Sequence, residues 1–300
     1  MIPFWLMRFI WISLGIYIKV INKKDHPVNR VLTYETFDKS VKVILIPTLW
    51  DNYSYIIVSG NDAIVIDPSD YKAILKEIKD RKLRLNSIVI THEHIDHVIG
   101  INQLQKKHGS PIYAPKNAIP GKITVVENGY KIPFGDVYLE AVVVPGHHSW
   151  PYPISSFKNN IAWYCSKASV LFTGDTLFSC GYGFMAKGHE REMWESLKKI
   201  RSFPDETLMF CGHEYSLMTT AFAASFDPEN IQLKKRINEV QNLIKNRQPT
   251  IPTTLGLEKA INPWLRWDDE KLIKKHGINK EGFESFMEIR KIKNEILNKK

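Results

Sequence analysis

Short apolar runs alternate with amphipathic stretches through the first two thirds of the chain. The folded part is predicted to begin at residue 41 with VKVILIPTL, followed by YIIV after the turn-like DNYS. AIVIDPSD is predicted to be a strand that ends in a turn, YKAILKEIKDRK an amphipathic helix and LNSIVIT a short buried strand. HVIGINQLQKKHG is predicted to be helical up to its glycine. This alternation predicts an α/β (α+β) fold.

The later strands and helices follow the same pattern and then change. Residues 111–172 contain short β-rich pieces between Pro and Gly turns, KASVLFTGD is a predicted strand, EREMWESLKKI a helix and TLMFCGHEY the final strand. From residue 217 onward NIQLKKRINEVQNLIKNRQ, DDEKLIKKH and EGFESFMEIRKIKNEIL all have helical spacing, with a Pro-containing connector between the first two. We therefore expect an α/β domain over residues 41–216 and a helical domain over residues 217–300.

The first 22 residues are almost continuously apolar. Arg8 and Lys19 flank a stretch with the length of a signal-peptide core, which is shorter than the roughly 20 residues that span a bilayer. We interpret residues 1–40 as a targeting leader to an organelle, plastid-type or mitochondrial, with the mature N-terminus before residue 41. An uncleaved anchor, with membrane contact through residues 1–22 alone, and a cytoplasmic protein are the alternatives.

Composition and charge exclude few classes. The chain is 44% hydrophobic and 24% charged, and its three cysteines form no CxxC pair, so neither a disulfide framework nor a cysteine zinc site is indicated. The net charge of +9 comes from residues 1–40 (six Lys/Arg, three Asp/Glu) and 216–300 (sixteen against eleven), which leaves +1 for the middle. A nucleic-acid partner is not expected, because the catalytic segment carries no basic excess. A small anionic substrate fits as well as a merely soluble basic surface.

The strongest chemical signal is HEHIDH, which follows LNSIVIT directly. His92 and His94 are two residues apart and point the same way on extended backbone, whereas Asp96 and His97 can address a second ion nearby. Imidazoles combined with carboxylates suit Zn²⁺ or Fe²⁺ better than Mg²⁺. The motif therefore predicts a metal site.

Three more candidates follow apolar strands, each directly after a glycine that can turn the backbone sharply. They are His147 after Gly146, Asp175 after Gly174 and His213 after Gly212. Strand-end loops that gather on one rim are where such folds build sites. The five other histidines are expected at ordinary surface or loop positions: His26, His108, His148, His189 and His276.

THEHIDH, PGH, TGD and CGHEY, in this order, resemble the metallo-β-lactamase superfamily. IPTLWDNYSY, GDTLF, CGHEYSL, NPWLR and RKIK are similar to motifs of glyoxalase II (hydroxyacylglutathione hydrolase). The resemblance covers about residues 41–294. It implies a metallo-β-lactamase-like αββα sandwich followed by a small helical C-terminal domain that helps bind glutathione.

The resemblance also implies a ligand set for two divalent metal ions, zinc or else iron or manganese. His92, His94 and His147 would hold the first ion, Asp96, His97 and His213 the second, and Asp175 both. It further implies hydrolysis of S-lactoylglutathione to glutathione and D-lactate, a step of methylglyoxal detoxification, by attack of a metal-bridging hydroxide. Separately, we expect a monomer, with the oligomeric state left open by the sequence. Asp96 and Asp175 are the expected catalytic carboxylates.

Substrate contacts are implied for three residues. Arg290 and Lys293 resemble the pair that grips the glycine carboxylate of glutathione, and three-residue spacing puts both on one face of a helix. Tyr215 in GHEY resembles a tyrosine that contacts the glutathione backbone. A solvated basic helix face and a packing tyrosine are the alternatives.

One loop departs from the family pattern. Where the family has a Lys and a Tyr for glutathione, this chain has Phe184 and Ala186, and Tyr182 or Lys187 is a candidate substitute. Hydrolysis is therefore better supported than the particular thioester. The alternatives are a persulfide dioxygenase, which keeps one iron on two histidines and an aspartate, another hydrolase of this fold such as a nuclease, and a membrane-anchored binding protein without turnover.

Overall fold

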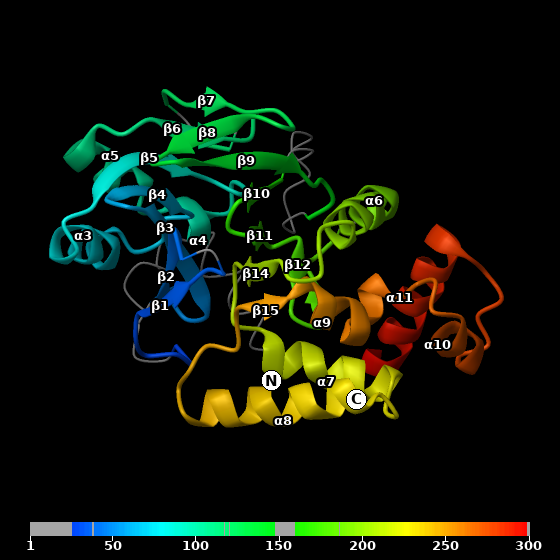
Figure 1. The fold of residues 1–300 in the computed structure, drawn as a ribbon. Coiled ribbons are helices and arrows are strands. Elements are labelled where there is room, and N and C mark those ends of the chain that lie inside the picture. The colour runs from blue at the N-terminus through cyan, green and yellow to red at the C-terminus, as the bar shows by residue number, and fades with distance from the viewer. Residues whose placement is uncertain are drawn as a thin grey trace.

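The computed structural model describes residues 26–37, 39–116, 118–119, 121–147, 160–185 and 187–298. Two β-sheets lie face to face, with helices on both outer sides and a group of helices from the last third of the chain beside the second sheet (Figure 1). This arrangement confirms the predicted αββα sandwich with a helical C-terminal part. The apolar leader at residues 1–22 lies outside the described residues. Among the helices that are described, none combines the length and apolarity needed to cross a bilayer.

The first sheet has its strands in sequence order and changes direction in the middle. Strands β1 to β4 are antiparallel neighbours, and β4 to β7 are parallel. The strands are β1 (Leu32–Glu35), β2 (Val41–Thr48), β3 (Asn52–Ser59), β4 (Asp62–Ile66), β5 (Arg84–Val89), β6 (Ile112–Ala114) and β7 (Thr124–Val125).

The second sheet has the order β15-β14-β11-β10-β9-β8, and β12 and β13 form a separate hairpin. Its parallel pair is β11 with β14. The strands are β8 (Lys131–Phe134), β9 (Val137–Val143), β10 (Ile161–Cys165), β11 (Val170–Gly174), β12 (Leu177–Phe178), β13 (Gly181–Tyr182), β14 (Leu208–Cys211) and β15 (Thr253–Thr254).

Side-chain alternation along the strands builds the layers. In β2, Val43 and Leu45 enter the core between the sheets, whereas Ile44 and Ile46 enter a second core under the outer helices. Those helices are α3 (Tyr71–Asp80), α4 (Ile95–Val98) and α5 (Ile101–His108). Strands β2, β3 and β4, and the last three residues of β5, are therefore buried on both faces, which fixes their register and holds the strand ends at defined positions.

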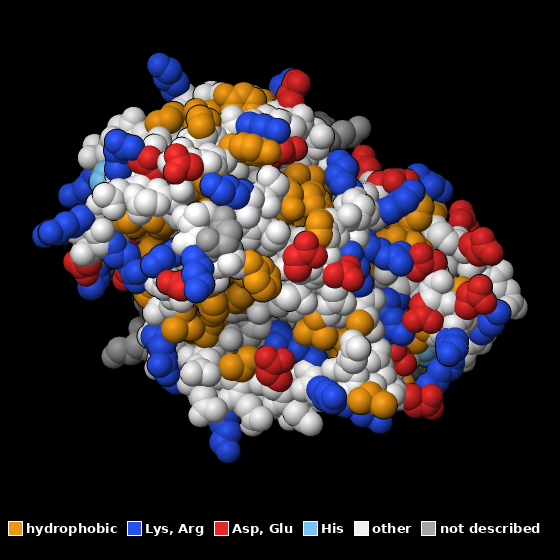
Figure 2. Space-filling model, viewed as in Figure 1, with side chains coloured by type: hydrophobic (Ala, Val, Ile, Leu, Met, Phe, Trp, Pro, Cys, Tyr) orange, Lys and Arg blue, Asp and Glu red, His pale blue; other side chains and the backbone are white. Residues whose placement is uncertain are grey.

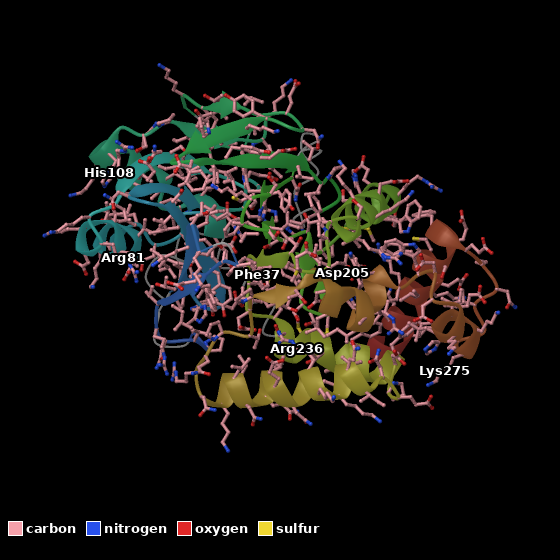
Figure 3. The ribbon with its side chains drawn as sticks, in the orientation of Figure 1. Phe37, Arg81, His108, Asp205, Arg236 and Lys275 are labelled. Atoms are coloured by element: carbon pink, nitrogen blue, oxygen red, sulfur yellow. The ribbon has the colours of Figure 1, made fainter. Side chains whose placement is uncertain are left out.

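The second sheet is covered by α6 (Glu190–Arg201) and by the C-terminal helices. These are α7 (Ser216–Phe226), α8 (Ile231–Lys245), α9 (Leu255–Ile261), η2 (Pro263–Leu265), α10 (Glu270–Lys275) and α11 (Gly282–Asn298). Trp264 and Phe286 share one buried cluster with Leu171 of β11. Arg236, labelled in Figure 3, is buried on α8 and donates to the carbonyl of Thr250. The helical part thus packs on the sandwich through a continuous core.

The expected start of the fold at Val41 is wrong. Residues before it form β1, which pairs with β2 along Leu32–Glu35, and Tyr34 donates from its hydroxyl to the carbonyl of Ile251 at 3.0 Å. Val28 is also buried in the core between the sheets. A four-residue edge strand with a charged end has too little periodicity to stand out from a polar leader.

Two other expectations need correction. The helix predicted after the HEHIDH motif is broken into α4 and α5 at Gly100, whose amide donates to the carbonyl of Pro68 at 2.8 Å and where a Cβ would lie 2.4 Å from that oxygen. Also, β14 is not the last strand, because the predicted connector supplies β15, α9 and η2. A two-residue strand carries no alternation from which it could be predicted.

Charged side chains of both signs are interspersed on the surface. Figure 2 shows Lys and Arg mixed with Asp and Glu over the whole face in view. Several lie in pairs one helical turn apart, such as Lys76 with Asp80 and Lys274 with Glu270. The excess positive charge is therefore not gathered into one field on that face.

Candidate metal centre

The predicted metal ligands all leave strand ends at the same edge of the sandwich. His92 follows β5, His147 follows β9, Asp175 follows β11 directly and His213 follows β14. Asp96 and His97 lie in α4, immediately after the first two histidines. Because β5 is in the first sheet and the other three strands are in the second, the side chains meet from both sides of the core.

The first half-site brings together His92, His94, His147 and Asp175. His94 Nδ1 lies 2.9 Å from His92 Nε2 and 3.2 Å from His147 Nε2. Asp175 Oδ2 lies 3.8 Å from His92 Nε2 and 3.6 Å from His147 Nε2. The four potential donor atoms lie within 4.8 Å of one another.

The second half-site brings together Asp96, His97 and His213, again with Asp175. The Nε2 atoms of His97 and His213 are 3.2 Å apart, and Asp96 Oδ2 is 3.8 Å and 3.5 Å from them. Asp175 Oδ1 lies 3.5 Å from His97 Nε2, and its Oδ2 lies 3.1 Å from His213 Nε2. Asp175 therefore faces both half-sites, as the resemblance implied.

Outer hydrogen bonds decide which ring nitrogens face the centre. His97 and His213 each place Nδ1 2.9 Å from a carboxylate oxygen, of Asp67 and Asp51 respectively. His147 Nδ1 lies 2.9 Å from the carbonyl oxygen of Phe184. Since these oxygens only accept, each Nδ1 carries the hydrogen, and each neutral ring points an Nε2 lone pair inward.

His92 is fixed in the same way through a hydroxyl. Thr91 Oγ1 lies 2.6 Å from Asp67 Oδ2 and must donate to it, so it accepts from His92 Nδ1 at 2.8 Å. The His92 Nε2 lone pair is then left facing the centre. Lone pairs about 3 Å apart repel unless a positive charge lies among them.

The spacing of the donor atoms fits bound metal ions. Zinc–nitrogen bonds of about 2.0–2.1 Å in a tetrahedral site place neighbouring donors ~3.3 Å apart, and the distances given above scatter from 2.9 to 3.8 Å around that value. The buried Asp175 Oδ1 also has no hydrogen bond in the described structure. We conclude that the residues present fit two divalent cations.

Burial lowers the pKa of two histidines of the centre, and nearby carboxylates raise the pKa of two others. Burial lowers the pKa of His92 well below its usual value and that of His94 to about 3, so both rings are neutral. Burial also opposes charge on His97 and His213, but the Asp175 carboxylate, together with Asp67 for His97 and Asp51 for His213, more than offsets it and raises each pKa to about 10. Without a cation these two rings take up protons on Nε2. A bound cation displaces those protons, so metal binding releases them.

Sequence analysis missed the outer acceptors Asp67 and Asp51. Asp67 follows the apolar strand β4, the same signal that identified the ligands, but it was assigned to a turn. Asp67, His92 and His97 also form a third group of possible ligands. Both Asp67 oxygens are already occupied, however, by Thr91 and by His97 Nδ1, the outward nitrogen. Asp67 therefore orients ligands and is not one itself.

Glycines permit the close packing of the loops, for two different reasons. Gly146 and Gly174 have φ of 125° and 50°, which favours glycine, as expected for sharp turns. Gly212 has no such φ, and its role is close approach: a Cβ there would lie 2.2 Å from Asp175 Oδ1. Gly183, which sequence analysis did not single out, would place a Cβ 2.8 Å from His147 Nδ1.

The three predicted substrate residues lie next to the centre or one loop away. The Tyr215 ring stacks on His213, with centroids 4.7 Å apart and an interplanar angle of 9°. On α11, Lys293 Nζ lies 5.1 Å from the ring centre of Tyr182, and Arg290 Nη2 lies 3.5 Å from the carbonyl oxygen of Met185. Burial, and then the charge of Arg290, lower the pKa of Lys293.

The segment of residues 181–185 connects the side chains of Arg290 and Lys293 with the metal centre. Its Phe184 carbonyl accepts from His147, and its neighbouring Met185 carbonyl faces Arg290. The Phe184 side chain is 56% exposed, whereas Ala186 lies outside the described residues. Arg290 also lies 3.8 Å from Glu190, which orients its guanidinium beside the loop.

Two family models together match most of the chain. Residues 47–213 match the metallo-beta-lactamase superfamily, and residues 214–296 match the hydroxyacylglutathione hydrolase C-terminus. The chain is 36% identical over 265 residues to the hydroxyacylglutathione hydrolase of Nostoc punctiforme, which covers 85% of this chain and 99% of the relative. It is 38% identical over 226 residues to the enzyme of that name from Nitrosomonas eutropha, covering 74% and 84%.

Solved structures confirm the fold. A metallo-beta-lactamase from Staphylococcus aureus matches with a TM-score of 0.54 and 21% identity, over 88% of this chain and 72% of that one. At this level of identity the likeness extends to the fold alone.

Loss of an outer acceptor is expected to weaken metal binding. Asp67→Ala leaves His97 Nδ1 and Thr91 without their buried acceptor, so metal affinity is expected to fall ~10–100-fold. Titration of the metal-free protein with Zn²⁺ against a competing chelator measures this. Asp62→Ala is the control at the opposite end of β4, since Asp62 pairs there with the exposed Arg84. Equal affinity for both variants would contradict the assignment.

A methyl group at Gly212 is expected to disrupt the shared carboxylate. Gly212→Ala pushes a Cβ against Asp175 Oδ1, which cannot move away because the side chain is buried. We expect metal content to fall below two ions per chain and hydrolytic activity to fall ~10–100-fold. Gly256→Ala on α9, which meets only Asp205 at 3.0 Å or more, is the matched control. Normal metal content in Gly212→Ala would show that the loop relaxes.

Proposed function

The chain belongs to the hydroxyacylglutathione hydrolase family of the metallo-β-lactamase superfamily, and on that basis we propose that it is a thioesterase with two divalent metal ions. It hydrolyses S-2-hydroxyacylglutathione, S-lactoylglutathione above all, to glutathione and a 2-hydroxy acid such as D-lactate. The observation that carries this proposal is the pair of complete half-sites that share Asp175, one loop away from Arg290 and Lys293.

The half-sites supply the electrophilic part of the chemistry. Two divalent cations held there would lower the pKa of water to about 7 and would polarise a carbonyl oxygen. Asp175 faces both half-sites from its buried position and sets the spacing between them. Imidazole and carboxylate donors favour zinc, with iron or manganese as the other candidates.

Asp96 is suited to orient the attacking water. Its side chain is 16% exposed, against 8% for Asp175, so it is the more open carboxylate of the centre. Asn52 Nδ2 donates to Asp96 Oδ2 at 2.9 Å and fixes that side chain. A hydrogen bond from water to Asp96 therefore aims the water oxygen at the acyl carbon.

Bond changes at the thioester need no amino-acid nucleophile. The water oxygen forms a bond to the acyl carbon, the carbon–sulfur bond breaks and its electron pair leaves with sulfur. A thiol with pKa near 8.5 is a good leaving group. The protons of the water pass to solvent and to the thiolate. Burial raises the pKa of Cys180 and Cys211 well above the ordinary range, so neither thiol offers a thiolate for covalent catalysis.

Recognition of glutathione is assigned to the cations of α11. Arg290 and Lys293 are three residues apart on one helix face, so both can bind one carboxylate. Tyr215 is half-buried and stacks on His213, so its ring lies directly beside the metal centre. With Phe184 in a place where the family has a polar residue, this chain depends more heavily on the two cations.

A persulfide dioxygenase of the same fold is less well supported. Such an enzyme keeps one iron on two histidines and an aspartate, whereas Asp96, His97 and His213 complete a second half-site here. Oxygen consumption with glutathione persulfide is the measurement that distinguishes the two activities.

For residues 1–22 we propose a targeting role, because an apolar run between Arg8 and Lys19 has the length of a signal-peptide core. An organelle is the proposed destination. Fluorescence microscopy of the full chain fused to a reporter tests this, with a chain lacking residues 1–22 as the comparison.

Removal of the cationic pair is expected to affect binding and spare chemistry. Arg290→Ala with Lys293→Ala should raise KM for S-lactoylglutathione ~10–100-fold with kcat within about threefold, since charge-assisted hydrogen bonds contribute ~1.5–3 kcal/mol. Steady-state kinetics on protein of measured metal content provide the test. Lys291→Ala, an exposed cation on the same helix, should leave KM unchanged.

A lactoyl thioester without the glycine carboxylate separates recognition from hydrolysis. The double variant should cleave it as fast as the wild type does. A wild-type protein that holds two metal ions and leaves S-lactoylglutathione intact would refute the proposed function.

A further inference from the structure

His26 is fully buried, although its place in the sequence suggested an ordinary loop histidine. The amide of Val28 donates to His26 Nδ1 at 2.9 Å, so Nδ1 carries no hydrogen. The hydrogen is therefore on Nε2, which lies 3.0 Å from the carbonyl oxygen of Asn52 and donates to it. These two contacts fix the ring's tautomer and aim its Nε2 at the first residue of β3.

Asn52 links that contact to the metal centre. Its Nδ2 donates to Asp96 Oδ2 at 2.9 Å and lies 3.4 Å from His213 Nε2. The backbones of Asn52 and His213 also form an isolated antiparallel bridge. The orientation of one asparagine thus affects two members of the second half-site.

The His26 ring is held from the other sides as well. Arg247, from the turn after α8, donates from Nη2 to the His26 carbonyl at 2.9 Å. The ring lies against Tyr53, with centroids 5.4 Å apart, and the Tyr53 hydroxyl donates to Glu214 at 2.7 Å. His26 therefore sits where the N-terminal segment, the sandwich and the helical part meet.

We propose that His26 is a positioning residue for the second half-site, which it supports through Asn52. The expected change in kcat rests on the proposed function, whereas the expected change in metal affinity does not depend on it. The segment that carries His26 precedes residue 47, where the match to the superfamily begins. This support is thus built by a part of the chain outside the matched region.

A merely structural histidine predicts a different pattern of effects. Packing alone would make His26 equivalent to its neighbour Val28, which is also buried and whose side chain has no hydrogen-bonding group. Val28→Ala keeps the amide that donates to His26. It therefore loosens the segment without touching the contact with Asn52, and it is the matched control.

The experiment compares His26→Ala, His26→Gln and Val28→Ala in the full chain. We expect His26→Ala to weaken the second metal site about tenfold and to lower kcat about tenfold, with KM within about twofold. The absorption spectrum of the Co²⁺-substituted protein should shift, because the ligand geometry changes. His26→Gln, whose amide can still donate to Asn52, should restore the spectrum and most of kcat.

Val28→Ala should lower Tm by a few degrees and leave metal affinity and kcat unchanged. If His26→Ala proves too unstable to purify, His26→Asn replaces it, since its shorter amide can still accept from Val28 but cannot reach Asn52. The proposal is overturned if His26→Ala or His26→Asn lowers only Tm and leaves metal affinity and kcat unchanged, as expected for Val28→Ala. It is also overturned if His26→Gln fails to restore the spectrum. A wild-type protein without thioesterase activity would refute the proposed function, while affinities and spectra would still decide the role of His26.

Discussion

The structure depends on nitrogen lone pairs that are held close together and pointed at one another. Each is kept in place by an oxygen on the far side of its ring: Asp67 for His97, Asp51 for His213 and the Phe184 carbonyl for His147. For His97 and His213, whose Nε2 atoms are 3.2 Å apart, positive charge relieves the resulting repulsion. Metal binding and the outer hydrogen bonds therefore stabilise each other, and neither is explained without the other.

The sandwich supplies the rigidity that this arrangement needs. The central strands of the first sheet are buried on both faces, and the two sheets are joined beside the site, where the Tyr53 amide of β3 donates to the carbonyl of Gly212 at 2.9 Å. The helical part adds Arg290 and Lys293, and its Phe286 packs against Tyr182. Two residues further along the chain, the carbonyl of Phe184 accepts the hydrogen bond that orients His147. The metal centre and the predicted substrate-binding residues thus contact the same short segment. A substitution that displaces this segment should therefore alter both of them.

Sequence patterns predicted the ligands and most long elements, for a physical reason. Ligands combine a distinctive side chain with an apolar strand and a glycine, and α3 or α8 has enough turns for periodicity to show. Asp67 follows an apolar strand as the ligands do, so its place near the metal centre could have been predicted from the sequence. His26 and Asn52 were not, because their roles arise from contacts with residues far away in the sequence. The short strands β1 and β15 likewise owe their existence to the partner strands that they meet.

The contact between Asp51 and His213 spans 162 residues. During synthesis, by contrast, His92, His94 and His147 leave the ribosome well before His213 does. The nascent chain can therefore gather the histidines of one half-site while the other, whose orienting residues Asp51 and Asp67 are already made, still lacks His213. The order of synthesis thus completes the histidines of the two half-sites one after the other.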